Sequence, residues 1–341
     1  MVLPTTYLAA LSLLIVSLIC WGSWANTLKL AGPHWRFELF CVDYALGVVL
    51  LSVVAAFTFG TLGSDLTFSD HMLVAGRMAQ VWVFAGGIIF NLANMLLVAA
   101  ISLAGLSVAF PVGIGLALII GVIWNYALSP QGNPALLFGG VAVVFIAILV
   151  DAAAYRARDR AGASPLNSEK RKPVTTKGLV VSVIAGIFMG AFYPFVEKGM
   201  PGDLGLGPYA SMLIFSFGVL LSTFVFNIYF MNLPIAGQPI PWSAYFRGTL
   251  RQHLLGIIGG VVWAVGTLTN FLAASTPAEV NVGPALSLAI GQGGTLVSVL
   301  WGVLVWKEFA GSDAKAKRLL GWMFALFVGG IVLLSLAPLF H

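Results

Sequence analysis

The chain has 341 residues, of which 60% are hydrophobic and 9% charged, with a formal net charge of +5. Soluble domains carry about 25% charged residues, so this chain has too few charges to cover a water-exposed surface. Its apolar residues form runs of about 20, long enough to cross ~30 Å of hydrocarbon. The basic residues lie between these runs, where membrane insertion explains them. The composition therefore predicts a membrane protein and argues against nucleic-acid binding.

Ten apolar segments predict an all-α integral membrane fold with ten transmembrane helices. The first segment lacks a basic n-region and a small-residue cleavage site, so we expect a retained helix and not a signal peptide. In chain order the segments are 6–28, 39–60, 80–104, 106–128, 134–154, 178–197, 208–231, 253–275, 282–306 and 319–339.

One polar segment, the basic linker 155–177, divides the chain into two five-helix repeats, 1–154 and 178–341. A constant shift of 173 residues superimposes several residues of the two halves. The coinciding pairs are Gly86 with Gly259, Gly87 with Gly260, Asn94 with Thr267, Pro111 with Pro284 and Gly121 with Gly294. Because each half has an odd number of segments, the repeats are predicted to be inverted, as in many carriers.

The basic residues also predict an orientation. Fifteen of the 17 lysines and arginines fall in the odd-numbered connections, and only Arg77 and Lys198 fall on the opposite side. Positive residues accumulate in short cytoplasmic loops. We therefore expect a multi-pass protein of the inner or plasma membrane, with both termini outside and the linker in the cytoplasm.

Polar side chains recur at helical spacing inside two of the apolar segments. Asn91 and Asn94 share one face of the third segment, and Trp263, Thr267 and Asn270 form a similar stripe in the eighth. An amide in hydrocarbon is costly unless it has a partner. These stripes predict substrate-binding residues around a cavity; the alternative is that they hydrogen-bond helices to one another.

Further substrate-binding candidates lie near glycines, prolines and span ends. Gln292 lies among glycines, and Trp21, Trp24 and Tyr193 are aromatic residues near the ends of the first and sixth segments. For the tryptophans, the alternative is an interfacial aromatic belt. Two prolines inside matching segments predict helix breaks that could line a site, Pro111 and Pro284.

Charged residues inside a membrane are functional candidates because their burial is expensive. Asp43, just inside the second segment, is the main ion-coupling candidate, and Glu279 at the start of the ninth is another. The alternative for Asp43 is an ion pair with Lys29 or Arg36. All four histidines lie at segment ends or in loops, which argues against a buried histidine relay.

Several short motifs resemble ureide permeases of the drug/metabolite transporter superfamily. They are Trp21-Gly-Ser-Trp24, Val42-Asp-Tyr44 with Ala56-Phe-Thr-Phe-Gly60, Gly86-Gly-x4-Leu-x-Asn94 followed by Gly105-Leu-Ser-Val108, Ile123-Trp-Asn-Tyr126, and Trp301-Gly-Val-Leu-x-x-Lys-Glu308. The resemblance implies a ten-helix fold and proton-driven uptake of allantoin-like ureides, nucleobases or related oxo-heterocycles. A more distant likeness links the chain to bacterial glucose/ribose porters. Plant ureide permeases carry a phosphate-loop-like motif in the central loop, and this chain has no such motif there.

We therefore predict a secondary active transporter for uptake of a small, polar, uncharged solute. A sugar porter of the glucose, ribose or rhamnose type is the main alternative, and a metabolite or drug exporter a weaker one. No clustered nucleophile, metal set or acid–base pair predicts an enzyme, and no cofactor is predicted. The expected partners are the solute, a coupling proton or other cation and the lipid bilayer; a homodimer stays open.

Overall fold

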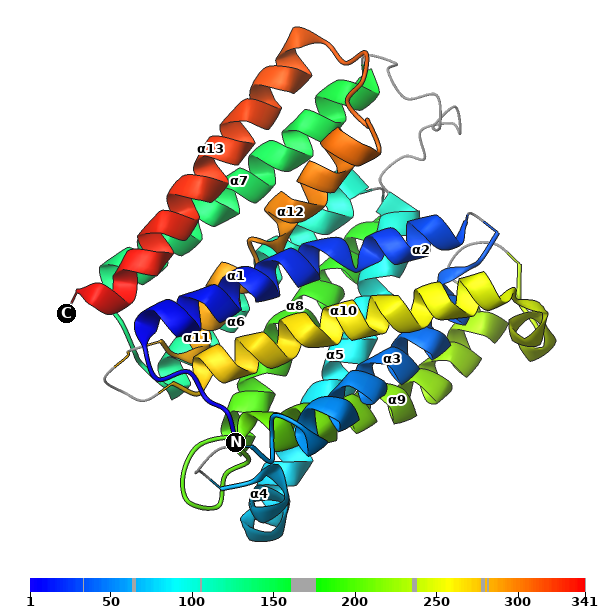
Figure 1. The fold of residues 1–341 in the computed structure, drawn as a ribbon. Coiled ribbons are helices and arrows are strands. Elements are labelled where there is room, and N and C mark those ends of the chain that lie inside the picture. Colours follow the sequence, from blue (N-terminus) through cyan, green and yellow to red (C-terminus); the bar gives the residue numbers. More distant parts are fainter. Residues whose placement is uncertain are drawn as a thin grey trace.

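The computed structural model describes residues 1–32, 34–62, 66–104, 106–160, 176–234, 238–276, 280 and 282–340. In these residues the regular secondary structure is helical (Figure 1). The helices are α1 (Tyr7–Ser23), α2 (Ala25–Ala31), α3 (Phe37–Phe57), α4 (Phe68–Val74), α5 (Arg77–Ala104), α6 (Leu106–Leu128), α7 (Pro134–Arg160), α8 (Thr176–Gly199), α9 (Pro208–Asn232), α10 (Leu250–Ala274), α11 (Pro284–Gly291), α12 (Gly294–Leu300) and α13 (Ala314–Leu336). Short 3-10 helices lie at η1 (Trp242–Arg247) and η4 (Ala337–Leu339), and a short π-helix lies at η3 (Trp301–Val305).

Within the described residues, nine helical segments are long and apolar enough to cross a membrane. Each of the nine coincides with a predicted segment. The remaining prediction, 106–128, coincides with α6, whose part Val112–Leu128 is a shorter apolar helix. The chain therefore forms a multi-pass helical membrane protein, as its composition predicts. The predicted linker is partly helical, because α7 continues to Arg160 and α8 starts at Thr176; residues 161–175 lie outside the described ones.

Two local features differ from a simple series of spans. Residues 68–74, expected in a loop, form the short helix α4, which Thr67 and Asp70 close with a capping box. The ninth segment is interrupted at Gln292 and Gly293, between α11 and α12. Pro284 starts α11 and does not break it, since a proline fits the first turn of a helix, where its missing N–H would have no partner.

The helices form one bundle whose centre is made by α1, α5, α8, α9 and α10 with α3. Helices α7 and α13 pack against each other at one side of the bundle (Figure 1). Close contact between α7 and α13 is made at glycines: a Cβ at Gly330 would lie 3.2 Å from the amide nitrogen of Val144. Small residues of this kind let apolar helices approach closely in membranes.

The basic connections gather at one end of the bundle. Arg36 Nη1 donates to the carbonyl of Gln238 at 2.7 Å, and Lys29 Nζ pairs with Glu308 at 2.8 Å. At the opposite end Tyr209 donates to the carbonyl of Val2, and the amide of Asn133 donates to the carbonyl of Ala337. The two ends of the chain thus lie on the side away from the basic connections.

Candidate functional site

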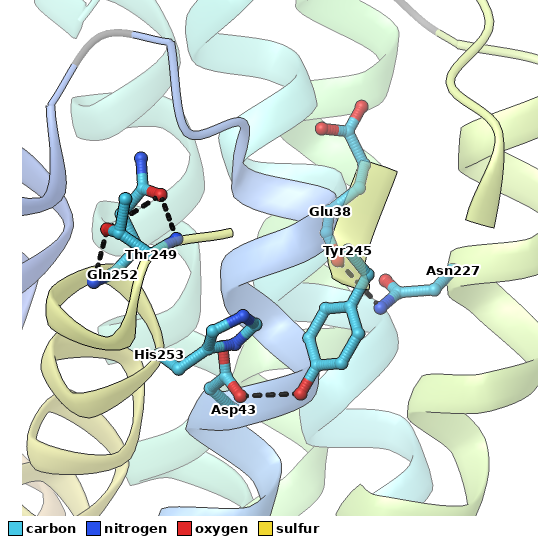
Figure 2. A network of polar contacts seen from close by, with 7 residues as sticks. All are labelled: Glu38, Asp43, Asn227, Tyr245, Thr249, Gln252 and His253. Atoms are coloured by element: carbon cyan, nitrogen blue, oxygen red, sulfur yellow. Dashed lines mark hydrogen bonds and ion pairs between the residues drawn. The ribbon is translucent and has the colours of Figure 1, made fainter. Parts of the chain in front are cut away.

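The carboxylate of Asp43 forms a polar network where α3, η1 and the start of α10 meet (Figure 2). Its Oδ1 accepts a hydrogen bond from the Tyr245 hydroxyl at 2.6 Å, and its Oδ2 lies 2.8 Å from Nδ1 of His253. The Asp43 side chain is 3% exposed and that of His253 is 23% exposed. The network therefore holds an ionisable group at the rim of the bundle with restricted access to water.

Local sequence explains why these side chains meet. Thr249 and Gln252 form a capping box that starts α10, and His253 follows in its first turn. Further along α10, a Cβ at Gly256 would lie 2.5 Å from the Cβ of Asp43. Only a glycine at this position avoids a clash with the Asp43 side chain. Burial, followed by the hydrogen bond and charge of Asp43, raises the pKa of Tyr245, so its phenol stays protonated and donates.

The structure pairs the two basic residues named as alternative partners of Asp43 with other carboxylates, Lys29 with Glu308 and Arg36 with Glu38. Asp43 itself contacts His253, a partner that sequence reasoning did not identify. This contact is a single pair with a partly exposed histidine and not the buried histidine relay that the sequence argued against. His253 lies at the end of its own helix, and α3 packs alongside α10, so the end of α10 reaches Asp43. The Thr249–Gln252 capping pattern was the available signal for the start of α10.

The amide of Asn270 connects four helices in the centre of the bundle. Its Oδ1 accepts from the Tyr193 hydroxyl of α8 at 2.7 Å, and its Nδ2 donates to the Ser17 hydroxyl of α1 at 3.2 Å and to the Ser287 carbonyl of α11 at 2.9 Å. Asn270 and Tyr193 are fully buried. Side chains from the first and second halves of the chain therefore share one buried polar cluster.

Other predicted residues surround this cluster. The indole of Trp21 donates to Thr267, one turn from Asn270, at 3.1 Å. Trp263 stacks on Phe90 with ring centroids 4.3 Å apart. Trp24 packs on Tyr44, whose ring also contacts Trp263. Six predicted substrate-binding residues thus lie in one central region: Trp21, Trp24, Tyr193, Trp263, Thr267 and Asn270.

The remaining candidates lie elsewhere or outside the described part. Asn91 binds α9, since its Nδ2 donates to Ser222 at 2.9 Å and to Thr223 at 3.1 Å, and Asn94 is buried one turn away. Gln292 is half-buried. Glu279 lies outside the described residues, as does the side chain of Pro111, although α6 is helical through that position.

An open groove of about 910 Å³ lies between α5 and α9. It is lined mainly by apolar side chains, among them Leu92, Val225 and Leu233, and by none of the predicted site residues. Val225 and Leu233 are more than half exposed. Lys177 at the start of α8 and Asn232 at the end of α9 also line the groove, which is therefore separate from the centre described above.

These features define a multi-pass helical membrane protein with a buried polar and aromatic centre and a separate carboxylate–histidine pair. Comparison with known proteins shows which families the chain resembles. A family model for ureide permeases matches residues 40–177. Ureide permease 2 of Arabidopsis thaliana is 24% identical over 95% of this chain and 96% of that protein, and ureide permease 1 of the same plant is 24% identical with the same coverage.

The chain is also similar to a bacterial glucose uptake protein. Glucose uptake protein GlcU of Staphylococcus xylosus is 23% identical over 94% of this chain and 93% of that protein. A crystal structure with 17% identity covers 96% of both chains with a TM-score of 0.59, which shows a shared fold. The chain therefore resembles ureide permeases along nearly its whole length and bacterial sugar porters more weakly, so the resemblance identified from its motifs is confirmed.

Proposed function

We propose that the chain is a secondary active transporter that takes up a small, polar, uncharged solute of the ureide or nucleobase type together with protons. The observation that carries the proposal is the Asn270 cluster, in which a neutral amide joins both halves of the chain beside tryptophan rings. The permease names of the relatives support transport over catalysis. Carriers place such sites where two repeats meet near the midplane.

The proposed architecture is ten transmembrane helices in two inverted repeats, and the helix contacts support it. The second helix of the first half, α3, crosses α10 closely. A Cβ at Gly47 of α3 would lie 2.1 Å from the carbonyl oxygen of Ile257, and a Cβ at Gly260 of α10 would lie 2.0 Å from the carbonyl oxygen of Tyr44. The equivalent second helix of the other half is α9. There a Cβ at Gly218 would lie 2.4 Å from the Phe84 carbonyl oxygen, and one at Gly87 of α5 would lie 2.2 Å from that of Phe215. Exchanging the halves therefore exchanges these two crossings.

A second pair of contacts follows the same exchange. The first helix of one half packs on the fourth helix of the other: a Cβ at Gly22 of α1 would lie 2.3 Å from the carbonyl oxygen of Gly294 in α12. In the other half a Cβ at Gly121 of α6 would lie 3.1 Å from the carbonyl oxygen of Gly190 in α8. Gly121 and Gly294 also coincide in the sequence repeat. These crossings support a two-fold relation between the repeats.

The chemistry of the centre favours an uncharged ring. Asn270, Thr267 and Trp21 offer neutral donors and acceptors, and the aromatic side chains offer flat faces. An oxo-heterocycle uses both features. A sugar is the second candidate, because the glucose uptake protein of Staphylococcus xylosus matches nearly the whole chain and sugars also combine hydrogen bonds with stacking on tryptophan.

Asp43 is the proposed proton-coupling residue. Protonation of its carboxylate would remove the negative charge that faces His253 and weaken the link between α3 and the start of α10. Since α10 also carries Trp263, Thr267 and Asn270, a shift of this helix would reach the solute region. The proposed orientation places the basic end, and this network, toward the cytoplasm in the inner or plasma membrane.

Thermal unfolding of the detergent-solubilised protein with a panel of solutes tests the proposed solute class, because a ligand that binds the folded state raises its apparent stability. We expect uracil- or allantoin-like rings to raise the unfolding temperature in a saturable way. A shift with glucose or ribose alone would favour the sugar candidate. If no member of either class gives a shift, the assignment is contradicted.

A further inference from the structure

The hydroxyl of Tyr44 is a buried polar group with no hydrogen-bond partner among the described residues. Tyr44 lies in α3 and is 2% exposed. Buried hydroxyls are nearly always paired, because an unpaired one loses its hydrogen bonds to water and gains nothing in return. This hydroxyl therefore needs a reason other than packing, since a phenylalanine ring would fill the same space without that cost.

Aromatic side chains from two other helices surround the ring. Its centroid lies 5.1 Å from that of Trp24 and 6.1 Å from that of Trp263, and 6.2 Å from that of Phe40 on its own helix. Phe90 of α5 stacks on the far ring, Trp263. The Tyr44 ring is thus enclosed by aromatic side chains from both halves of the chain.

The backbone fixes Tyr44 in this position. The site of a Cβ on Gly260 lies 2.0 Å from the Tyr44 carbonyl oxygen, so α3 and α10 touch through their main chains at this point. The backbone of Tyr44 is therefore held directly against α10. A side chain held so closely is well suited to present its hydroxyl in a defined place.

Tyr44 also lies between the two networks described above. Asp43, its neighbour in sequence, pairs with His253, whereas Trp263 lies on α10 one turn before Thr267 and two before Asn270. A ligand bound at Tyr44 would contact α1, α3 and α10 together. Its binding would therefore depend on how α3 and α10 are packed, and the proposed coupling depends on the same contact.

We propose that Tyr44 is a solute-recognition residue, whose O–H donates a hydrogen bond to a ring carbonyl of a planar oxo-heterocycle held against Trp24 and Trp263. The inference rests on the proposed transport function and extends it to a named donor and acceptor. In the present arrangement the rings contact one another, so the solute enters when α1 and α10 part. Its carbonyl then supplies the partner that the hydroxyl lacks.

Removing only the hydroxyl tests this role. Tyr44→Phe keeps the ring, so the ligand-free protein should unfold at the same or a higher temperature. Its Kd for the oxo-heterocycle that binds the parent should rise about tenfold, which corresponds to ~1.4 kcal/mol. Tyr209→Phe is the matched control, because the Tyr209 hydroxyl donates to the Val2 carbonyl at 2.9 Å at the other end of the bundle. That variant should unfold at a lower temperature and bind with the parent's affinity.

Thio-analogues of uracil test whether the Tyr44 hydroxyl contacts the solute, because a purely structural role of this hydroxyl would not change the preference between uracil and its thio-analogues. Sulfur is a weak hydrogen-bond acceptor, so the parent should prefer uracil over at least one of 2-thiouracil and 4-thiouracil, and Tyr44→Phe should lose that preference. Equal affinity and equal preference in parent and variant would overturn the inference while leaving transport intact. If the parent binds no oxo-heterocycle, the proposed function and this inference both fail.

Discussion

Replacing Asp43 by asparagine tests the coupling role of the α3–α10 network. The substitution keeps the side-chain volume and removes the charge. The carboxylate accepts hydrogen bonds from Tyr245 at 2.6 Å and shares one with His253 at 2.8 Å. Hydrogen bonds to charged groups contribute about 1 kcal/mol more than neutral ones. With two bonds affected, we expect Asp43→Asn to lower the free energy of unfolding by about 2 kcal/mol.

Transport separates this structural cost from the coupling role. In proteoliposomes, Asp43→Asn should still exchange labelled solute across the membrane at equilibrium, but should no longer accumulate it when a proton gradient is imposed. Glu38→Gln is a suitable control, because Glu38 lies on the same helix and pairs with Arg36 instead. The reasoning is refuted if Asp43→Asn accumulates solute as the parent does and loses it equally on addition of a protonophore.

Further predictions follow from the contacts between helices. Asn270→Ala removes three hydrogen bonds; at ~0.6 kcal/mol each in a membrane, it should cost roughly 2 kcal/mol of stability and abolish solute binding. Asn91→Ala removes the hydrogen bonds from α5 to α9 and should cost a similar amount of stability. Loss of solute binding in Asn270→Ala but not in Asn91→Ala would place the solute at Asn270. Solute binding that persists in Asn270→Ala would exclude Asn270 from the site. Gly260→Ala should prevent correct assembly, seen as aggregation in size-exclusion chromatography, because its Cβ would overlap the Tyr44 carbonyl; a monodisperse, fully active variant would contradict this. Glu308→Gln, which breaks the ion pair with Lys29, should increase labelling of a cysteine placed at the basic end. Unchanged labelling would show that this ion pair does not restrict access there.

Sequence periodicity predicted the membrane segments well because hydrophobicity determines which residues can lie in lipid. It missed α4, whose seven residues include Asp70 and His71 and are too few and too polar to resemble a span. It also assigned the interruption of the ninth segment to Pro284. The break falls instead at Gln292 and Gly293, because proline fits a first helical turn and glycine does not favour a continuous helix.

The candidate site was only partly accessible from sequence. The stripe of Trp263, Thr267 and Asn270 could be identified from helical spacing alone. The pairing of Asp43 with His253 could not, because it joins residues far apart in the chain and depends on how α3 crosses α10. The unpaired hydroxyl of Tyr44 became visible only once its surroundings were known, since a tyrosine in an apolar segment looks like any other aromatic residue.

Accumulation of a labelled ureide or nucleobase in proteoliposomes is the most direct test of the transport function. With an inward proton gradient, the account predicts saturable uptake that raises the internal concentration above the external one and collapses with a protonophore. Uptake no greater than in empty liposomes, or simple equilibration that ignores the gradient, would contradict it.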